Sequence, residues 1–152
     1  LAYYSAFFSI RAMDNFDASC MIFGKEKVKN KMKEIDMKGN SATKKEQDMY
    51  AVLELVLEMY ERNLNFLPID LYKSHYKNFI VEDDGIRPPF SAIAGFGPIA
   101  AENLYKAAKE GEFMSIDEIR MGAKLGDSAI DLLRQFGVLD GMQESNQISL
   151  FG

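Results

Sequence analysis

Residues 91–111 read SAIAGFGPIAAENLYKAAKEG, and this stretch decides the fold. Proline is favoured at the first position of an α-helix, so Gly97-Pro98 predicts that a helix begins there. Gly111 predicts where it ends, because glycine is common just beyond the last helical turn. Upstream, Gly95 and Gly97 flank a single phenylalanine, and glycine readily adopts the positive φ angles of a tight turn. The stretch therefore predicts a tight turn that leads directly into a helix.

With Ala101, the two glycines form a GxGxxxA pattern that resembles the helix-hairpin-helix motif of DNA-binding proteins. It is not the dinucleotide-binding fingerprint, because the third glycine and the preceding parallel strand are missing. The first N–H groups of a helix lack internal acceptors and carry the positive end of its dipole, so they can hold a phosphate without a basic side chain. Pro98 removes one such donor. The residues expected at the DNA backbone are Gly95, Phe96, Gly97, Ile99, Ala100 and Lys106. The alternative is a plain turn between two helices.

A second, degenerate copy of the hairpin is predicted at residues 123–136, which read AKLGDSAIDLLRQF. Lys124 and Gly126 would occupy the turn, and Ser128 would lie at the start of the next helix. Two such hairpins can hold both strands of a duplex, through contacts that carry no base information. Asp127 counts against this assignment, because its charge would repel a phosphate.

The rest of the chain predicts mainly helices. Residues 1–13 are aromatic on nearly every face, which indicates a buried helix. Thr43 and Glu46 form a capping-box pattern before a wide apolar stripe, which predicts a long helix. Residues 77–90 change to a strand pattern around a DDG turn, which predicts a small β-hairpin. Further helices are expected over residues 25–38, 115–121 and 127–136. The expected fold is mainly α with a small β-hairpin, in which packed helices precede a tandem helix-hairpin-helix module.

The formal net charge of −5 argues against a protein whose whole surface attracts nucleic acid. Eight lysines against three acidic residues gather between positions 25 and 45. That stretch is either a solvated helix face or a basic arm near DNA phosphates. The single Cys20 cannot form an internal disulfide, which favours a reducing compartment and a small core residue. His75 has no His or Cys neighbours, so it is expected at the surface and not at a metal.

The chain ends NQISLFG, and residues 147–151 resemble the pentapeptide that bacterial clamp-binding proteins insert into the sliding clamp. The usual form is Gln-Leu-Ser/Asp-Leu-Phe, so only Ile148 departs from it. Leu150 and Phe151 are large apolar groups that a pocket on a partner could cover, and Gln147 would supply orienting hydrogen bonds. The expected clamp-binding residues are Gln147, Ile148, Ser149, Leu150 and Phe151. The alternative is a tail strand that folds back on this domain.

Several quoted stretches, in this order along the chain, resemble the end of the alpha subunit of bacterial DNA polymerase III. They are PIDLYKS (68–74), FIVEDDGIRPPFSAIAGFG (79–97), EGEF (110–113), FGVLD (136–140) and the terminal NQISLF. The resemblance is strongest to the PolC type of Gram-positive bacteria. The opening LAYYSAFFSIRA is also similar to the helix that leads out of the fingers region of that family.

This resemblance implies a parent enzyme that extends a primer with deoxynucleoside triphosphates, using magnesium ions held by aspartates before this segment. For the segment itself it implies no catalytic residue, no metal site and no cofactor. The implied partners are duplex DNA, bound through its phosphates independently of sequence, the sliding clamp and the rest of the alpha subunit. A cytoplasmic location without a membrane partner is implied as well. The implied parts are a helical continuation of the fingers (1–24), two helices (25–66), the β-hairpin with the tandem module (67–141) and a flexible clamp-binding tail (142–152).

Two other interpretations stay open: a helix-hairpin-helix module of a DNA repair enzyme, and a non-catalytic adaptor that docks other proteins. A repair glycosylase would need a catalytic Asp or Lys just beyond the hairpin, and no convincing one is present. Phosphate contacts make DNA affinity fall steeply with salt, whereas an adaptor would show no DNA affinity to lose.

Overall fold

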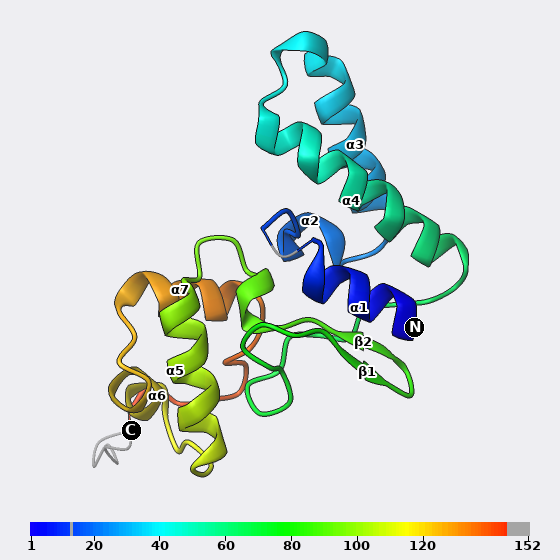
Figure 1. The fold of residues 1–152 in the computed structure, drawn as a ribbon. Helices are drawn as coiled ribbons and strands as arrows, with labels where there is room; N and C mark the ends of the chain where they lie inside the picture. The colour runs from blue at the N-terminus through cyan, green and yellow to red at the C-terminus, as the bar shows by residue number, and fades with distance from the viewer. Residues whose placement is uncertain (13, 146–152) are drawn as a thin grey trace.

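The computed structural model describes residues 1–12 and 14–145, and this part of the chain is mainly helical. The helical elements are α1 (Ala2–Ile10), α2 (Ala18–Met21), α3 (Lys25–Lys38), the 3-10 helix η1 (Gly39–Ser41), α4 (Lys44–Glu61), the 3-10 helix η2 (Phe90–Ala92), α5 (Pro98–Lys109), α6 (Ile116–Gly122) and α7 (Asp127–Gln135). Strands β1 (Ile80–Glu82) and β2 (Gly85–Arg87) form an antiparallel sheet. Figure 1 shows α3 and α4 as an arm at one end, α5 to α7 at the other, and α1 beside the sheet between them. The predicted fold class, mainly α with a small β-hairpin, is confirmed.

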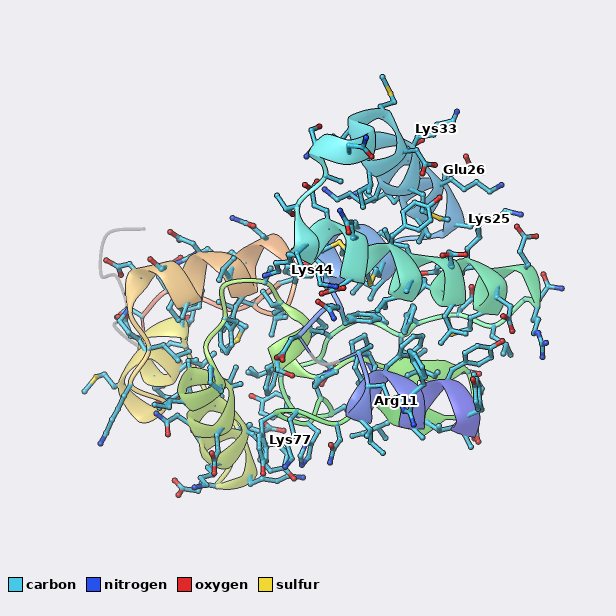
Figure 2. The ribbon with its side chains drawn as sticks, turned by 45° about the horizontal axis from the view of Figure 1, so that its top comes forward. Arg11, Lys25, Glu26, Lys33, Lys44 and Lys77 are labelled. Atoms are coloured by element: carbon cyan, nitrogen blue, oxygen red, sulfur yellow. The ribbon has the colours of Figure 1, made fainter. Side chains whose placement is uncertain are left out.

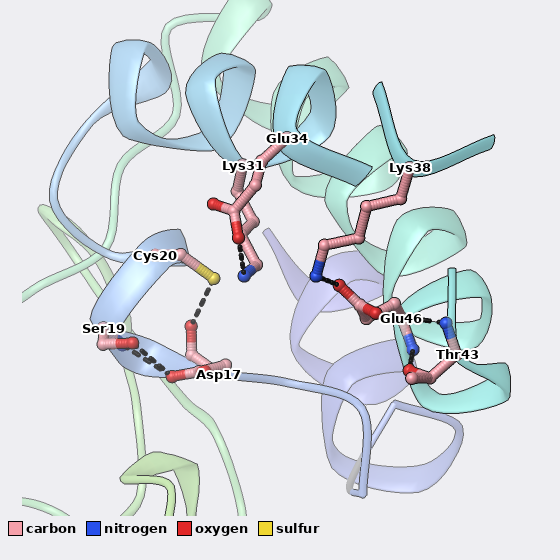
Figure 3. A network of polar contacts seen from close by, with 8 residues as sticks. All are labelled: Asp17, Ser19, Cys20, Lys31, Glu34, Lys38, Thr43 and Glu46. Atoms are coloured by element: carbon pink, nitrogen blue, oxygen red, sulfur yellow. Dashed lines mark hydrogen bonds and ion pairs between the residues drawn. The ribbon is translucent and has the colours of Figure 1, made fainter. Parts of the chain in front are cut away.

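The arm of α3 and α4 is closed by the capping box that the sequence predicts. Thr43 Oγ1 accepts a hydrogen bond from Glu46 N at 3.1 Å, and Glu46 Oε1 accepts one from Thr43 N at 3.1 Å. Lys38, at the end of α3, pairs with the same carboxylate at 2.5 Å (Figure 3). The hydrogen bond from Lys38 and the backbone bond from Thr43 lower the pKa of Glu46 to about 2. The start of α4 is therefore fixed both locally and against α3.

α1 buries one face and exposes the other. Tyr4 and Phe8 are buried, whereas Tyr3 is 67% and Ile10 74% exposed. The predicted helix is present and its inner face is buried, and among the described residues only one side of α1 is covered.

The buried face of α1 meets a cluster of phenylalanines. Phe8, Phe16, Phe66 and Phe79 have ring centroids 4.8 to 6.4 Å apart. Phe79 is also held through its backbone: its N–H donates to Ser9 Oγ at 2.8 Å and its carbonyl accepts from Ser5 Oγ at 2.8 Å. Burial of a large apolar side chain contributes about 1.5–3 kcal/mol, so this cluster joins α1 firmly to the sheet.

The β-hairpin is extended by the segment that follows α4. β1 and β2 pair with Val81 opposite Ile86. Ile86 N donates to Asn65 O at 3.0 Å, and Leu67 N donates to Ile86 O at 2.7 Å, so residues 65–67 run alongside β2. Gly85 has φ of +155°, and a Cβ atom there would lie 2.4 Å from Asn65 O. Only glycine fits this crossing. Residues 65 and 66, which the sequence groups with the two helices, thus pack with the sheet.

The third part of the described chain, α5 to α7, has a core to which both predicted hairpins contribute. Phe96 of the first turn is 5% exposed, and Leu125 of the second is also 5% exposed. A ring stack ties this part to the other helices, with the centroids of Phe23 and Phe136 5.8 Å apart and their planes inclined by 27°. Each hairpin is thus anchored by one apolar side chain that points inwards.

Candidate nucleic-acid interface

The first hairpin is a tight turn whose backbone faces outwards. Gly95 has φ of +86°, the left-handed region that glycine tolerates. Phe96 N donates to Ile93 O at 3.0 Å, which closes the turn. Gly97 is extended, with φ −66° and ψ 156°, and caps α5, whose first residue is Pro98. The predicted helix start at Pro98 is confirmed, and the helix preceding the hairpin is only the short η2 (Phe90–Ala92).

The first amides of α5 are open. Ala101 N donates to Gly97 O at 2.9 Å and is the first amide that the helix itself satisfies. Within residues 1–12 and 14–145, the N–H groups of Gly97, Ile99 and Ala100 have no acceptor. Ile99 is 75% exposed, and a Cβ atom added at Gly97 would meet nothing within 4 Å. The first turn of α5 contains no acidic residue, so these amides present partial positive charge to an open surface.

Lys106 lies apart from these amides. It is in the last turn of α5 and pairs with Glu102 at 3.1 Å. A helix rises about 1.5 Å per residue, which places Lys106 about 10 Å along the axis from Ile99. The structure therefore brings Gly95, Gly97, Ile99 and Ala100 together but does not bring Lys106 to them.

The second hairpin repeats the geometry of the first. Lys124 has φ of +55°, the counterpart of Gly95, and Leu125 is buried as Phe96 is. Gly126 is extended and caps α7, and Ile130 N donates to Gly126 O at 3.2 Å. A left-handed lysine costs about 1–2 kcal/mol, and the buried Leu125 beside it holds the backbone in that conformation.

The open amides of the second hairpin are those of the first residues of α7. Among the described residues, the N–H groups of Asp127, Ser128 and Ala129 have no acceptor, and Ser128 is exposed. The side chain of Asp127 does not stand alone, because Arg120 of α6 forms an ion pair with it. The two residues come from the helices on either side of the turn, and the guanidinium charge opposes the repulsion that Asp127 would exert on a phosphate. Nothing in the sequence spacing pointed to Arg120.

Helix α6 is different, since its start is closed. Ile116 N donates to Gln143 O at 2.9 Å and Asp117 N donates to Glu144 O at 3.0 Å. Glu144 is held in turn by Arg134 of α7, at 2.5 and 3.0 Å. Residues 143 and 144, which the sequence places in a flexible tail, are thus docked on α6. The clamp-binding residues Gln147, Ile148, Ser149, Leu150 and Phe151 lie outside the described residues.

The lysine-rich helix α3 presents its charges away from both hairpins. Figure 2 shows Lys25 and Lys33 on the side of α3 that faces away from α5 to α7. Lys31 pairs with Glu34 at 3.2 Å, and the Lys27 ammonium lies 5.1 Å from the Phe23 ring centroid. The structure does not bring the lysines of α3 to the hairpins, whereas Lys45, at the start of α4 in the same basic stretch, lies close to the first hairpin.

Cys20 and His75 are both partly buried among neighbouring side chains. Cys20 is half-buried, and its burial raises the thiol pKa to about 11. His75 is partly exposed and lies between Tyr76 and Tyr105, at ring-centroid distances of 4.3 and 4.7 Å. Burial lowers the pKa of His75, whose Nδ1 accepts the backbone N–H of Lys77.

In the described part of the chain, no group of three or more His, Cys, Asp or Glu could hold a metal ion. None of the described helices is both long and apolar enough to cross a membrane.

Comparison with known proteins agrees with the geometry of the two hairpins. The profile of the helix-hairpin-helix motif matches residues 63–148, more than half of the chain. The chain belongs to the helix-hairpin-helix family. The helix-hairpin-helix match spans both open helix starts, the β-hairpin that precedes them and the docked residues 143 and 144.

Relatives that match almost the whole of this chain include proteins named DNA polymerase III PolC-type. Over 151 residues the chain is 46% identical to the DNA polymerase III PolC-type of Clostridium perfringens and 40% identical to that of Bacillus subtilis. It is 46% identical over 153 residues to the DNA polymerase III PolC-type of Streptococcus suis. Each alignment covers 99% of this chain and 10% of the relative, so the chain spans about a tenth of the length of these curated relatives.

Proposed function

We propose that this chain is the duplex-binding region of a replicative DNA polymerase of the PolC type, near its C-terminus. The observation that carries the proposal is the repeated hairpin: two buried turn residues, two extended glycine caps and two sets of open helix-start amides. Membership of the helix-hairpin-helix family and relatives named DNA polymerase III PolC-type support it.

The grip comes from the main chain. The amides of Gly97, Ile99 and Ala100 would hold a phosphate of one strand, and those at the start of α7 would hold a phosphate of the other. These contacts read no bases, so the duplex is positioned independently of its sequence. A formal net charge of −5 is compatible with this grip, because oriented amides supply the local positive potential.

The parent enzyme would extend primers with deoxynucleoside triphosphates in the cytoplasm, with magnesium held by aspartates outside this chain. The described residues contain no cluster of carboxylates suited to the metal. Magnesium would supply charge neutralisation at the reacting phosphates. The residues of this chain would bind the new duplex and orient it behind the active site.

Residues Gln147 to Phe151 would tether the enzyme to the sliding clamp. Tethering raises the effective concentration of the primer end near the polymerase, so weak contacts are sufficient for processive synthesis. The docked residues 143 and 144 support this role, because they fix the point from which the peptide would leave the module.

The duplex proposal is tested by adding bulk at the hairpin cap. Gly97→Leu should weaken binding to short duplexes of unrelated sequence by at least about tenfold, or about 1.4 kcal/mol. The missing Cβ of Gly97 faces open space, so melting should be little changed. Gln135→Leu adds an apolar group at the far, exposed end of α7 and should bind like the parent. Equal affinity of the Gly97 variant and the control in a salt titration would reject the hairpin as the DNA site.

The clamp proposal has a separate test. Pull-down by the sliding clamp should be lost when Leu150 and Phe151 are both changed to alanine, while duplex affinity stays the same. Undiminished capture by the clamp would refute the assignment of the terminal peptide and leave the duplex proposal standing.

A further inference from the structure

A hollow of about 410 Å³ lies directly beside the first hairpin. Its walls come from four separate segments: the loop after α1, the start of α4, the loop before β1 and the hairpin itself. The hairpin contributes Gly95 and Pro98 to the lining, and both are exposed. The hollow therefore opens next to the amides of α5 that have no acceptor in the described chain.

Two cations on different walls of this hollow are free of carboxylates. Lys45 at the start of α4 and Lys77 in the loop before β1 line it, and both are exposed. Neither forms an ion pair with any residue that the structure describes; Lys77 only lies over Tyr76, 5.8 Å from the ring centroid. Figure 2 shows Lys77 between α5 and α1. The two ammonium groups are therefore available to an anion that enters the hollow.

The lining also contains three carboxylates, those of Asp14, Asp17 and Glu102. Asp17 accepts from Ser19 N at 3.0 Å and from Ser19 Oγ at 2.7 Å, and Glu102 pairs with Lys106 at 3.1 Å. Asp14 is the one acidic lining residue for which the described chain provides no partner. Its negative charge opposes an anion in the hollow. Removing that charge should therefore strengthen DNA binding, whereas removing either lysine should weaken it.

The two hairpins differ in whether they contain a cation, and the lysines of this hollow bring one to the hairpin that lacks it. The second hairpin carries its own cation, Lys124, at the position that Gly95 occupies in the first. The first hairpin has no charged residue from Gly95 to Ala101, and its exposed helix-start side chain is the apolar Ile99. Lys77 and Lys45 supply from neighbouring elements the charge that Lys124 supplies within the second hairpin.

We propose that this hollow holds a second backbone phosphate of the DNA strand gripped by the first hairpin, with Lys77 and Lys45 as its cationic ligands. The inference rests on the proposed function and adds two binding residues outside the helix-hairpin-helix repeat. Lysine binds phosphate as a point charge, so these contacts are independent of base sequence and sensitive to salt.

The test is the salt dependence of duplex binding by the protein. Each phosphate contact contributes about −0.9 to the slope of log affinity against log salt. The double variant Lys45→Gln/Lys77→Gln should make the slope less steep by about that amount, and each single variant should make it less steep by part of it. Asp14→Asn should tighten binding.

Matched controls remove one charge outside the hollow. Lys73→Gln lies in the same loop region as Lys77, and Lys33→Gln lies on the arm that carries Lys45; neither residue lines the hollow. Slopes for the Lys77 and Lys45 variants equal to those of these controls would overturn the proposal. If Gly97→Leu still weakens binding in that case, only the hollow is refuted; if it does not, the duplex proposal fails as well.

Discussion

At the scale of single residues, a few side chains and glycines decide where the backbone may go. Gly85 passes so close to the chain after α4 that a Cβ atom would lie 2.4 Å from Asn65 O. Thr43 and Glu46 fix the first turn of α4, and Lys38 locks that turn to α3 (Figure 3). Phe96 and Leu125 hold the two hairpin turns by pointing into the core.

The crossing at Gly85 predicts a large stability effect. Gly85→Ala should lower the free energy of unfolding by about 3 kcal/mol, because it combines positive-φ strain with a clash against backbone. Gly24→Ala is the matched control, since Gly24 has φ of +102° but nothing within 4 Å of the added Cβ; it should cost about 1–2 kcal/mol, from backbone strain alone. Urea denaturation measures both. Equal losses in the two variants would mean that the contact with Asn65 contributes nothing.

Glu46 predicts a pH-dependent contribution to stability. Its pKa is lowered from 4.5 to about 2, first by the hydrogen bond from Lys38. A depressed carboxyl pKa stabilises the fold above the ordinary value and loses that effect as the pH falls towards the lowered one. The melting temperatures of the parent and Glu46→Gln should therefore differ near neutral pH and converge as the pH drops from 4.5 towards 2. A difference that stays constant over this range would contradict the ion pair with Lys38.

At the scale of elements, phosphate binding depends on the ends of helices more than on their faces. α5 and α7 begin with amides that the described chain leaves open, whereas the start of α6 is closed by the carbonyls of Gln143 and Glu144. Of these three helices, only α5 and α7 begin with amides that are open to a phosphate. Arg120 links α6 to the second of them through its ion pair with Asp127.

That ion pair predicts effects of opposite sign on duplex binding. Arg120→Gln leaves Asp127 uncompensated beside the phosphate and should weaken binding by about threefold, or about 0.6 kcal/mol. Asp127→Asn frees the guanidinium and should tighten binding by a similar factor. The controls Arg134→Gln and Asp131→Asn make the same charge changes away from the cap of α7. Fluorescence anisotropy with a short duplex measures all four, and effects no larger than those of the controls would show that Arg120 does not shield Asp127.

Short sequence patterns predicted the helices and strands well. They could not predict contacts between segments that are far apart in the chain. The capping box at Thr43, the proline start of α5 and the turn at Lys124 each lie within a few residues, so their physics is legible in the sequence. The pairing of residues 65–67 with β2 and the docking of residues 143–144 on α6 join distant segments without a periodic pattern. The same holds for the candidate site: the hairpin residues could be predicted, but the neighbourhood of Arg120, Lys45 and Lys77 depends on how the elements pack.

At the scale of the whole molecule, the two hairpins lie at one end and the lysine-rich arm at the other (Figure 1). The stack of Phe23 on Phe136 couples them, and such a pair contributes about 0.5–1.5 kcal/mol beyond its burial. The chain is acidic overall, with a formal net charge of −5. The proposed attraction to DNA must therefore come from a limited part of the surface. That part is the region where open helix-start amides lie beside unpaired lysines.

Backbone amide NMR spectra of the protein, recorded during titration with a short DNA duplex, would show which groups contact the DNA. We predict that the resonances of Gly97, Ile99 and Ala100, together with those of Asp127, Ser128 and Ala129, shift most and do so alike for unrelated duplex sequences. Shifts confined to the lysines of α3, with the six hairpin amides unmoved at saturation, would contradict the claim that main-chain donors grip the duplex.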